Sequence, residues 1–225
     1  MKNLIVVRPL PGAMRTVAAA SAMGLVAIPM PVQDYEPVDW QEPEGPFDGL
    51  LVGSAMAFRF PSPMFDATLD LPVHAVGRTT AAMAESAGYT VASVGEGGLQ
   101  AVLDGLPDDE PLRLLRVGGE DKVALEPPPH VELVECAVYR LIDVELTEGQ
   151  AKLLRSPVCV LLHSAGAARS FRRNCERLAL DREAIALACL GPRIAQAAGT
   201  GWGRVMSAST PNDTALLALA RTMCQ

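Results

Sequence analysis

The chain has 225 residues, with 19 basic and 26 acidic side chains and a formal net charge of −7. Hydrophobic residues make up 49% of it, charged residues 20% and aromatic residues only 4%. This composition is that of a globular protein and excludes extensive disorder. The negative charge and the scarcity of aromatic side chains argue against a general nucleic-acid binder, which needs a basic surface and stacking rings.

No apolar run reaches the ~18–20 residues that a membrane-spanning helix needs. The first apolar run, at 4–7, is followed by Arg8 and Pro9 and is too short for the hydrophobic region of a secretory signal. We therefore expect a soluble, cytoplasmic protein without a membrane partner.

Short apolar runs alternate with helical patterns along the whole chain. Strands are predicted at residues 3–7, 25–29, 49–53, 73–76, 89–94, 112–116, 131–136, 158–162, 184–190 and 203–207. Helices are predicted at residues 12–23, 79–88, 98–105, 147–155, 165–179, 192–199 and 211–223. Several strands are continuously apolar, as expected where helices cover both faces of a sheet. This order predicts an α/β fold with parallel strands and right-handed crossovers, divided into two small doubly wound sheets.

Composition and charge suggest where the chain divides. Residues 29–46 are rich in proline and acidic residues and are predicted to form an extended linker and loop, and 138–144 is a second candidate crossing. Residues 32–143 hold 6 basic and 20 acidic side chains, a net of −14. Residues 1–31 and 144–225 together hold 13 basic and 6 acidic side chains, a net of +7. We expect a basic domain built from both termini and an acidic inserted domain, with solubility and chance as the alternative explanation of the asymmetry.

Common catalytic and metal-binding motifs are missing. The five cysteines include no C-x-x-C pair and the three histidines lack metal-ligand spacing, so neither a disulfide framework nor a zinc site is indicated. The chain has no Walker A loop, no G-x-G-x-x-G after a strand and no G-x-S-x-G elbow. His163 and Ser164 are adjacent, but neighbouring side chains at a strand end point opposite ways, which favours a packed or solvated histidine over a catalytic base.

Small polar residues recur where predicted strands end. GLLVGSAMAF ends a strand at Ser54 and VCVLLHSAGAARSF ends one at Ser164, while AVGRTTAAMAESAGY and CLGPRIAQAAGTGW resemble each other. Such turns leave backbone N–H groups and helix N-termini open, which makes them anion receptors. In open α/β sheets, ligands bind outside these carboxyl ends. The alternative is that they are only tight turns and helix caps.

The order of these landmarks resembles the uroporphyrinogen-III synthase family over essentially the full chain. The matching segments are RPLPGA, IPM, LLVGSAMAF, AVGRTTAAMA, LRLLRVGGED, VECAVYRL, VLLHSAG, ACLGPRIAQAA and DTALLALA. The resemblance implies two α/β domains joined by a two-stranded linker, with a ligand cleft between them. It also implies a cyclising enzyme that converts hydroxymethylbilane, a carboxylate-rich linear tetrapyrrole, to uroporphyrinogen III with inversion of ring D and loss of water.

The resemblance implies no metal or organic cofactor, and a monomer that meets the preceding pathway enzyme only transiently. It places a cleft tyrosine at Tyr139, which could donate a proton or hydrogen bond to the departing hydroxyl, although a tyrosine there is as often a packing residue. The substrate-binding residues that it implies are Arg8, Ser54, Thr80, Arg116, Gly118, Ser164, Gly191 and Arg193. For Arg8 and Arg116, a solvated side chain on the sheet rim is the alternative.

One position departs from the family pattern. GPRIA stands where G-P-T-T-A is common, so Ile194 replaces a hydroxyl-bearing residue, and Arg193 offers a different anion contact. This departure leaves open a second class of function, a non-enzymatic tetrapyrrole- or anion-binding regulatory protein of the same fold. Formation of the type III rather than the type I isomer separates the two classes.

Overall fold

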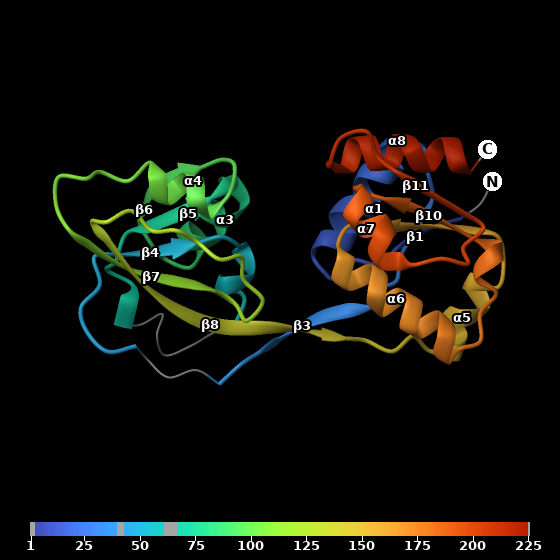
Figure 1. The fold of residues 1–225 in the computed structure, drawn as a ribbon, viewed down its shortest axis with the longest axis horizontal. Coiled ribbons are helices and arrows are strands. Elements are labelled where there is room, and N and C mark those ends of the chain that lie inside the picture. Colours follow the sequence, from blue (N-terminus) through green and yellow to red (C-terminus); the bar gives the residue numbers. More distant parts are fainter. Residues whose placement is uncertain (1–2, 40–42, 61–66, 225) are drawn as a thin grey trace. The chain divides into compact units, whose positions relative to one another are not determined.

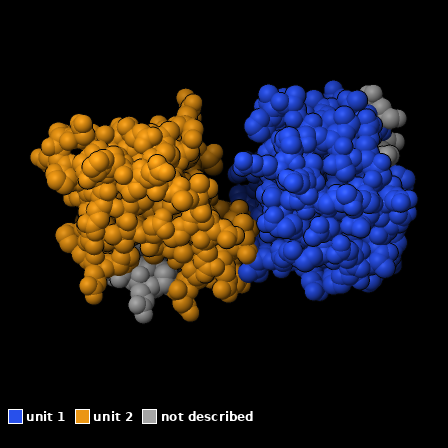
Figure 2. All heavy atoms as spheres, in the orientation of Figure 1, with its two compact units in different colours: residues 1–34, 142–225 blue, residues 35–141 orange. Residues whose placement is uncertain are grey.

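A computed structural model describes residues 3–39, 43–60 and 67–224. The chain divides into two compact units, which are coloured separately in Figure 2. Unit 1 comprises residues 1–34 and 142–225, and unit 2 comprises residues 35–141. These divisions lie within three residues of the boundaries suggested by charge, at 31/32 and 143/144. Part of the proline-rich segment, 40–42, lies outside the described residues.

Unit 1 is built on a five-stranded parallel sheet with the order β11-β10-β9-β1-β2 (Figure 1). Its strands are β1 (Asn3–Val6), β2 (Ala27–Pro29), β9 (Val158–Leu162), β10 (Ile185–Cys189) and β11 (Arg204–Ser207). The first strand therefore pairs with a strand from the C-terminal part of the chain. The central strand β9 is buried at every residue, as its uninterrupted VCVLL sequence predicts.

Helices cover both faces of this sheet. One face packs against α1 (Gly12–Ala22) and α8 (Asp213–Met223), and the other against α5 (Glu148–Leu154), α6 (Ala165–Arg177) and α7 (Pro192–Ala198). A short 3-10 helix, η2 (Arg182–Ala184), precedes β10. Phe171 of α6 is fully buried against Trp202, whose ring stacks on it with centroids 5.7 Å apart. The two faces together give unit 1 a core on each side of the sheet.

Unit 2 is built on a six-stranded sheet with the order β3-β8-β7-β4-β5-β6. Its strands are β3 (Gln33–Pro37), β4 (Gly49–Val52), β5 (Val73–Val76), β6 (Val91–Gly95), β7 (Leu112–Gly119) and β8 (Val131–Asp143). The 3-10 helix η1 (Ala55–Phe58) and α3 (Gly77–Ser86) cover one face, and α4 (Leu99–Asp104) covers the other. The pairs from β8 to β6 are parallel, so the predicted doubly wound α/β fold with parallel sheets is confirmed.

The two chain crossings lie within β3 and β8. Val38 N–H donates to the Val138 carbonyl, and Val144 N–H donates to the Val32 carbonyl, so the two segments run in opposite directions. Within the segment 29–46, expected to be an extended linker and loop, residues 33–37 form strand β3. β8 extends seven residues past its predicted end at 136, and with β3 it forms a two-stranded linker, as the family resemblance implies. The pairing satisfies backbone N–H and C=O groups of both segments. Neither the proline-rich sequence nor the hydrophobic pattern indicates this pairing. No helix among the described residues is long and apolar enough to cross a membrane.

Candidate functional site

The predicted site residues gather where parallel strands end. In unit 1, Arg8 follows β1, Ser164 follows β9 and Gly191 follows β10. In unit 2, Ser54 follows β4, and Gly118 lies near the end of β7. Parallel strands place their carboxyl ends at one edge of a sheet, so each unit has its own polar carboxyl edge.

Both strand-end serines act as helix caps. The Ser54 hydroxyl oxygen accepts a hydrogen bond from the Met56 N–H at 3.2 Å, and that of Ser164 accepts one from the Ala167 N–H at 3.1 Å. Each satisfies one of the otherwise unpaired N–H groups at the start of a helix. The hydroxyl hydrogen of each serine remains able to donate to a ligand, because the cap uses only an oxygen lone pair.

Thr80 and the α7 segment differ in exposure. Thr80 is only 4% exposed and lies in the first turn of α3, whereas its neighbour Thr79 is exposed. Arg193 is exposed on α7, and Ile194 packs against the core of unit 1. The side chain that replaces the family's hydroxyl therefore has a packing role here.

Arg116 is buried in an ion pair. Its side chain is 6% exposed, and its Nη1 donates to Glu135 Oε1 at 2.7 Å. Lys122 holds the other oxygen of Glu135 at 2.7 Å. The Lys122 hydrogen bond, more than that of Arg116, keeps the pKa of Glu135 below its ordinary value, although partial burial opposes the change. The alternative of a solvated arginine on the rim is wrong.

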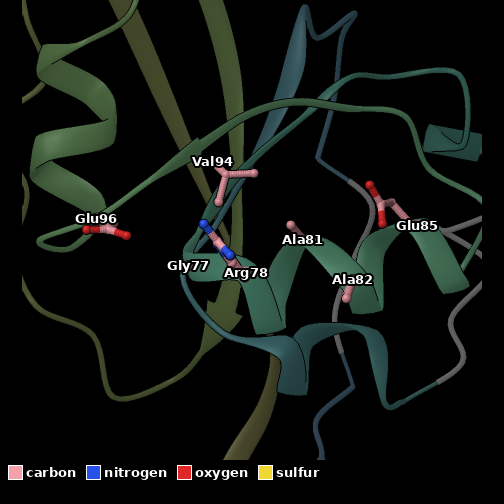
Figure 3. Close-up of a pocket in the computed structure, with 7 residues that line it drawn as sticks. All are labelled: Gly77, Arg78, Ala81, Ala82, Glu85, Val94 and Glu96. Atoms are coloured by element: carbon pink, nitrogen blue, oxygen red, sulfur yellow. The ribbon is translucent and has the colours of Figure 1, made fainter.

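Two hollows border the carboxyl edge of unit 2. One, of about 510 Å³, is lined by Gly53, Val76, Gly97, Gly98, Leu99, Gln100, Arg116, Val123, Ala124, Leu125 and Glu126. The other, of about 420 Å³, is shown in Figure 3 and is lined by Gly77, Arg78, Ala81, Ala82, Glu85, Val94 and Glu96. The first combines apolar walls with the Arg116 guanidinium, which is already paired with Glu135, and with the acidic Glu126. The second carries both signs of charge on α3 and the end of β6.

Tyr139 lies on β8 against a glycine of β7. A Cβ on Gly119 would come within 2.7 Å of the Tyr139 ring, so only glycine leaves room for it. The ring also makes an edge-on contact with Tyr35, with centroids 5.4 Å apart, and a tilted one with Phe60 at 6.4 Å. The β-bulge between Gly118 and Gly119 shifts the register opposite this tyrosine. These contacts fix the ring from several sides.

Sequence reasoning missed a carboxylate that contacts Arg8 and the histidine that lies against that carboxylate. Asp213, the first residue of α8, lies 3.5 Å from Arg8 Nη1 and 2.8 Å from the Thr16 hydroxyl. His163, expected to be packed or solvated, is packed, with its side chain 6% exposed and Nε2 3.2 Å from Asp213. The residues lie up to 205 positions apart, so no local motif could have indicated this cluster.

Burial makes the cysteine thiols poor nucleophiles. All five cysteines are buried, and burial raises the pKa of Cys175 to about 12 and that of Cys189 to about 11. Thiols with such pKa values are protonated and unreactive at neutral pH. Across residues 3–39, 43–60 and 67–224, no group of three or more His, Cys, Asp or Glu side chains could hold a metal ion.

The fold and these edges define a class of protein: a two-unit α/β protein with polar side chains and helix N-termini after its parallel strands. A family model described as uroporphyrinogen-III synthase HemD matches residues 14–218. The chain therefore belongs to the uroporphyrinogen-III synthase family, cyclising lyases of tetrapyrrole biosynthesis. The family and enzyme class expected from the sequence landmarks are confirmed.

The fold is shared with a solved structure at low sequence identity. A uroporphyrinogen-III synthetase structure from Helicobacter pylori is 16% identical and covers 99% of this chain and 100% of its own, with a TM-score of 0.68. A Thermus thermophilus uroporphyrinogen III synthase is 17% identical with full coverage of both chains, and its TM-score is 0.42. A search of curated proteins found no match.

Proposed function

We propose that the chain closes hydroxymethylbilane to uroporphyrinogen III, with inversion of ring D and loss of water. The observation that carries this proposal is the family match along residues 14–218. In this reaction the substrate's C–O bond breaks, and the hydroxyl leaves with one proton as water. The resulting azafulvene is electrophilic, and the substituted carbon of ring D attacks it to give a spiro intermediate that rearranges to the type III macrocycle.

The substrate's eight carboxylates are matched by groups at the carboxyl edges. Backbone N–H groups and hydroxyls hold anions without exchanging protons with them. Unit 1 carries 13 basic and 8 acidic side chains, a net of +5, which attracts a polyanion to it. We assign substrate binding to the set expected from the sequence: Arg8, Ser54, Thr80, Arg116, Gly118, Ser164, Gly191 and Arg193.

Tyr139 is assigned the role of assisting hydroxyl departure. Its phenol can donate a hydrogen bond or proton to the leaving oxygen. The ring contacts with Tyr35 and Gly119 hold that phenol in a defined direction. Because the pyrrole nitrogen itself expels the hydroxyl, this donor needs to give only modest help. The larger task is to fold the bilane so that ring D reaches the electrophilic carbon.

The division of labour between units is also part of the proposal. Residues 1–31 with 144–225 form the basic domain and residues 32–143 the acidic one, to within a few residues of the compact units. We expect the enzyme to act in the cytoplasm, as a monomer, and to meet the preceding pathway enzyme only transiently. Light scattering with and without that enzyme checks the oligomeric state and the absence of a stable complex.

The test is the isomer formed from enzymatically made hydroxymethylbilane. Without an enzyme the bilane closes to the type I isomer, so this reaction is the control. Type III product, separated by chromatography after oxidation, supports the proposal. Type I product alone, together with tight binding of the bilane, would identify the non-enzymatic alternative, which the packed Ile194 side chain makes worth testing.

A further inference from the structure

Four residues from distant segments meet at the carboxyl edge of unit 1. Arg8 follows β1, Thr16 lies on α1, His163 follows β9 and Asp213 begins α8. The Asp213 carboxylate is their common partner. Its Oδ2 accepts a hydrogen bond from the Thr16 hydroxyl at 2.8 Å, and its Oδ1 lies 3.2 Å from His163 Nε2. Arg8 Nη1 lies 3.5 Å from both oxygens.

The closer partners of the carboxylate are buried. Thr16 is 0% exposed and the His163 side chain 6%. The His163 ring is within ion-pair distance of Asp213 but is not oriented for a linear hydrogen bond, and its Nδ1 has no partner among the described residues. A buried nitrogen without a partner is destabilising. The cluster is therefore poorly explained as a device for stability alone.

Arg8 is only weakly bound by this carboxylate, but its guanidinium lies close against Gly12. A Cβ on Gly12 would lie 2.6 Å from Arg8 Nε, 3.0 Å from Cζ and 3.1 Å from Nη2, so the guanidinium lies against the first residue of α1. Within the described part of the chain, only Nη1 has an acceptor, at the long distance of 3.5 Å. A guanidinium has five N–H donors, and the side chain is 29% exposed, so most donors remain for a ligand.

We propose that Asp213, Thr16, His163 and Gly12 form a cradle that positions the Arg8 guanidinium for a carboxylate of the tetrapyrrole substrate. Asp213 and His163 are positioning residues that act through Arg8. Gly12 supplies the space in which the guanidinium lies, and Asp213 orients its Nη1 edge. The remaining N–H groups form the planar fork that binds a carboxylate at two points. This inference rests on the proposed function, because it takes the substrate's carboxylates as the ligand.

The test compares Asp213→Asn, His163→Gln and Gly12→Ala, each alone and combined with Arg8→Ala. Steady-state cyclisation gives KM and kcat separately. Alone, each variant should raise KM about tenfold with kcat nearly unchanged, because a charged hydrogen bond to the substrate is weakened. With Arg8→Ala present, none should raise KM further, because residues that act through one group are not additive.

Gly149→Ala is the matched control for Gly12→Ala. A Cβ at this glycine on α5 would meet only the Thr147 hydroxyl, at 3.7 Å, so KM should not change. Thermal unfolding of every variant separates misfolding from lost binding, and Asp213→Asn serves as the test if Gly12→Ala fails to fold. Full additivity with Arg8→Ala, or a wild-type KM in Asp213→Asn, would overturn the cradle.

The outcome stays distinct from that of the proposed function. If the wild-type protein forms no type III isomer, the proposed function fails. The same variants are then compared for binding of uroporphyrin, a stable tetrapyrrole octacarboxylate, by fluorescence quenching. The cradle is supported if Asp213→Asn weakens uroporphyrin binding in the wild-type background but not in the Arg8→Ala background. It is refuted if Asp213→Asn binds uroporphyrin as tightly as the wild type.

Discussion

The two units place an arginine near the end of a parallel strand, and they use it differently. In unit 1, the Arg8 side chain is 29% exposed and lies 3.5 Å from a carboxylate that has two closer partners. In unit 2, the Arg116 side chain is 6% exposed and donates at 2.7 Å to Glu135. The same residue type at a similar place in the sheet is thus available for a ligand in one unit and largely committed in the other.

The comparison shows that partners, more than position, decide what a strand-end charge can do. Unit 2 carries 6 basic and 18 acidic side chains, a net of −12, against +5 for unit 1. In acidic surroundings an arginine finds a carboxylate within its own unit. In basic surroundings the Asp213 carboxylate near Arg8 is shared with Thr16 and His163, and among the described residues most donors of the guanidinium have no acceptor.

The largest expected effects come from substituting each of these two arginines in turn. Arg8→Ala should raise KM for the bilane about 10- to 100-fold while changing stability little, because it removes a charge-assisted contact to the ligand. Arg116→Gln should lower the free energy of unfolding by about 2 kcal/mol, because it breaks a buried ion pair, and should raise KM less. Urea unfolding and steady-state kinetics on both variants measure the two quantities.

Arg155→Ala is the control for this pair, since the Arg155 side chain is half exposed and its ion pair with Glu148, at 3.4 Å, lies on the surface. It should change neither quantity. A larger rise in KM for Arg116→Gln than for Arg8→Ala would reverse the comparison and make unit 2 the main source of carboxylate binding.

The fold was more predictable than the site, for physical reasons. Continuous apolar runs such as 158–162 mark buried parallel strands directly, because helices cover both faces of the sheet. β3 was not among the strands predicted from apolar runs, because its sequence QDYEP is polar and acidic and its strand character depends on pairing with β8. Asp213 was missed because the cluster joins residues 8, 16, 163 and 213, which only the folded sheet brings together. The burial of Arg116 likewise depends on Glu135 in the neighbouring strand.

Tyr139→Phe should have a smaller effect, about a tenfold loss of kcat. The ring keeps its contacts with Tyr35 and Gly119, so the variant removes a donor without disturbing packing. The type III isomer should persist, because ring inversion depends on how the bilane is folded. The measurements are kcat and the isomer ratio. An unchanged kcat would make Tyr139 a packing residue, and a switch to type I product would show that it positions ring D.

The strand-end serines allow a like-for-like comparison of the units. Ser54→Ala and Ser164→Ala should each lower the free energy of unfolding by about 1 kcal/mol, because each removes a helix cap. Ser164→Ala should cost more, since it caps a helix of 13 residues that carries the buried Phe171, whereas Ser54 caps a 3-10 helix of 4. Substrate affinity should fall only a few-fold. Complete loss of activity in either variant would identify a catalytic hydroxyl instead.

The smallest expected effect concerns the acid limit of unit 1. Contact with the His163 ring lowers the pKa of Asp213 most, and the Thr16 hydroxyl and Arg8 guanidinium add to this, so that the pKa falls from 3.8 to about 2 although burial opposes it. A pKa depressed by folding means that the ionised carboxylate stabilises the native state fully above the unfolded value. This stabilisation is lost as the pH falls from about 4 toward 2.

Because the Asp213 side chain is 34% exposed, solvent screening should keep this contribution below about 1 kcal/mol. Urea unfolding of the wild type and Asp213→Asn at pH 5, 4, 3 and 2 measures it, and the stability difference between them should shrink over this interval. Glu135→Gln provides the unit 2 comparison, since the pKa of Glu135 is also lowered, chiefly by Lys122. A difference that stays constant from pH 5 to pH 2 would mean that Asp213 titrates alike in both states. His163, Thr16 and Arg8 would then stabilise the ionised Asp213 carboxylate no better than water does in the unfolded chain.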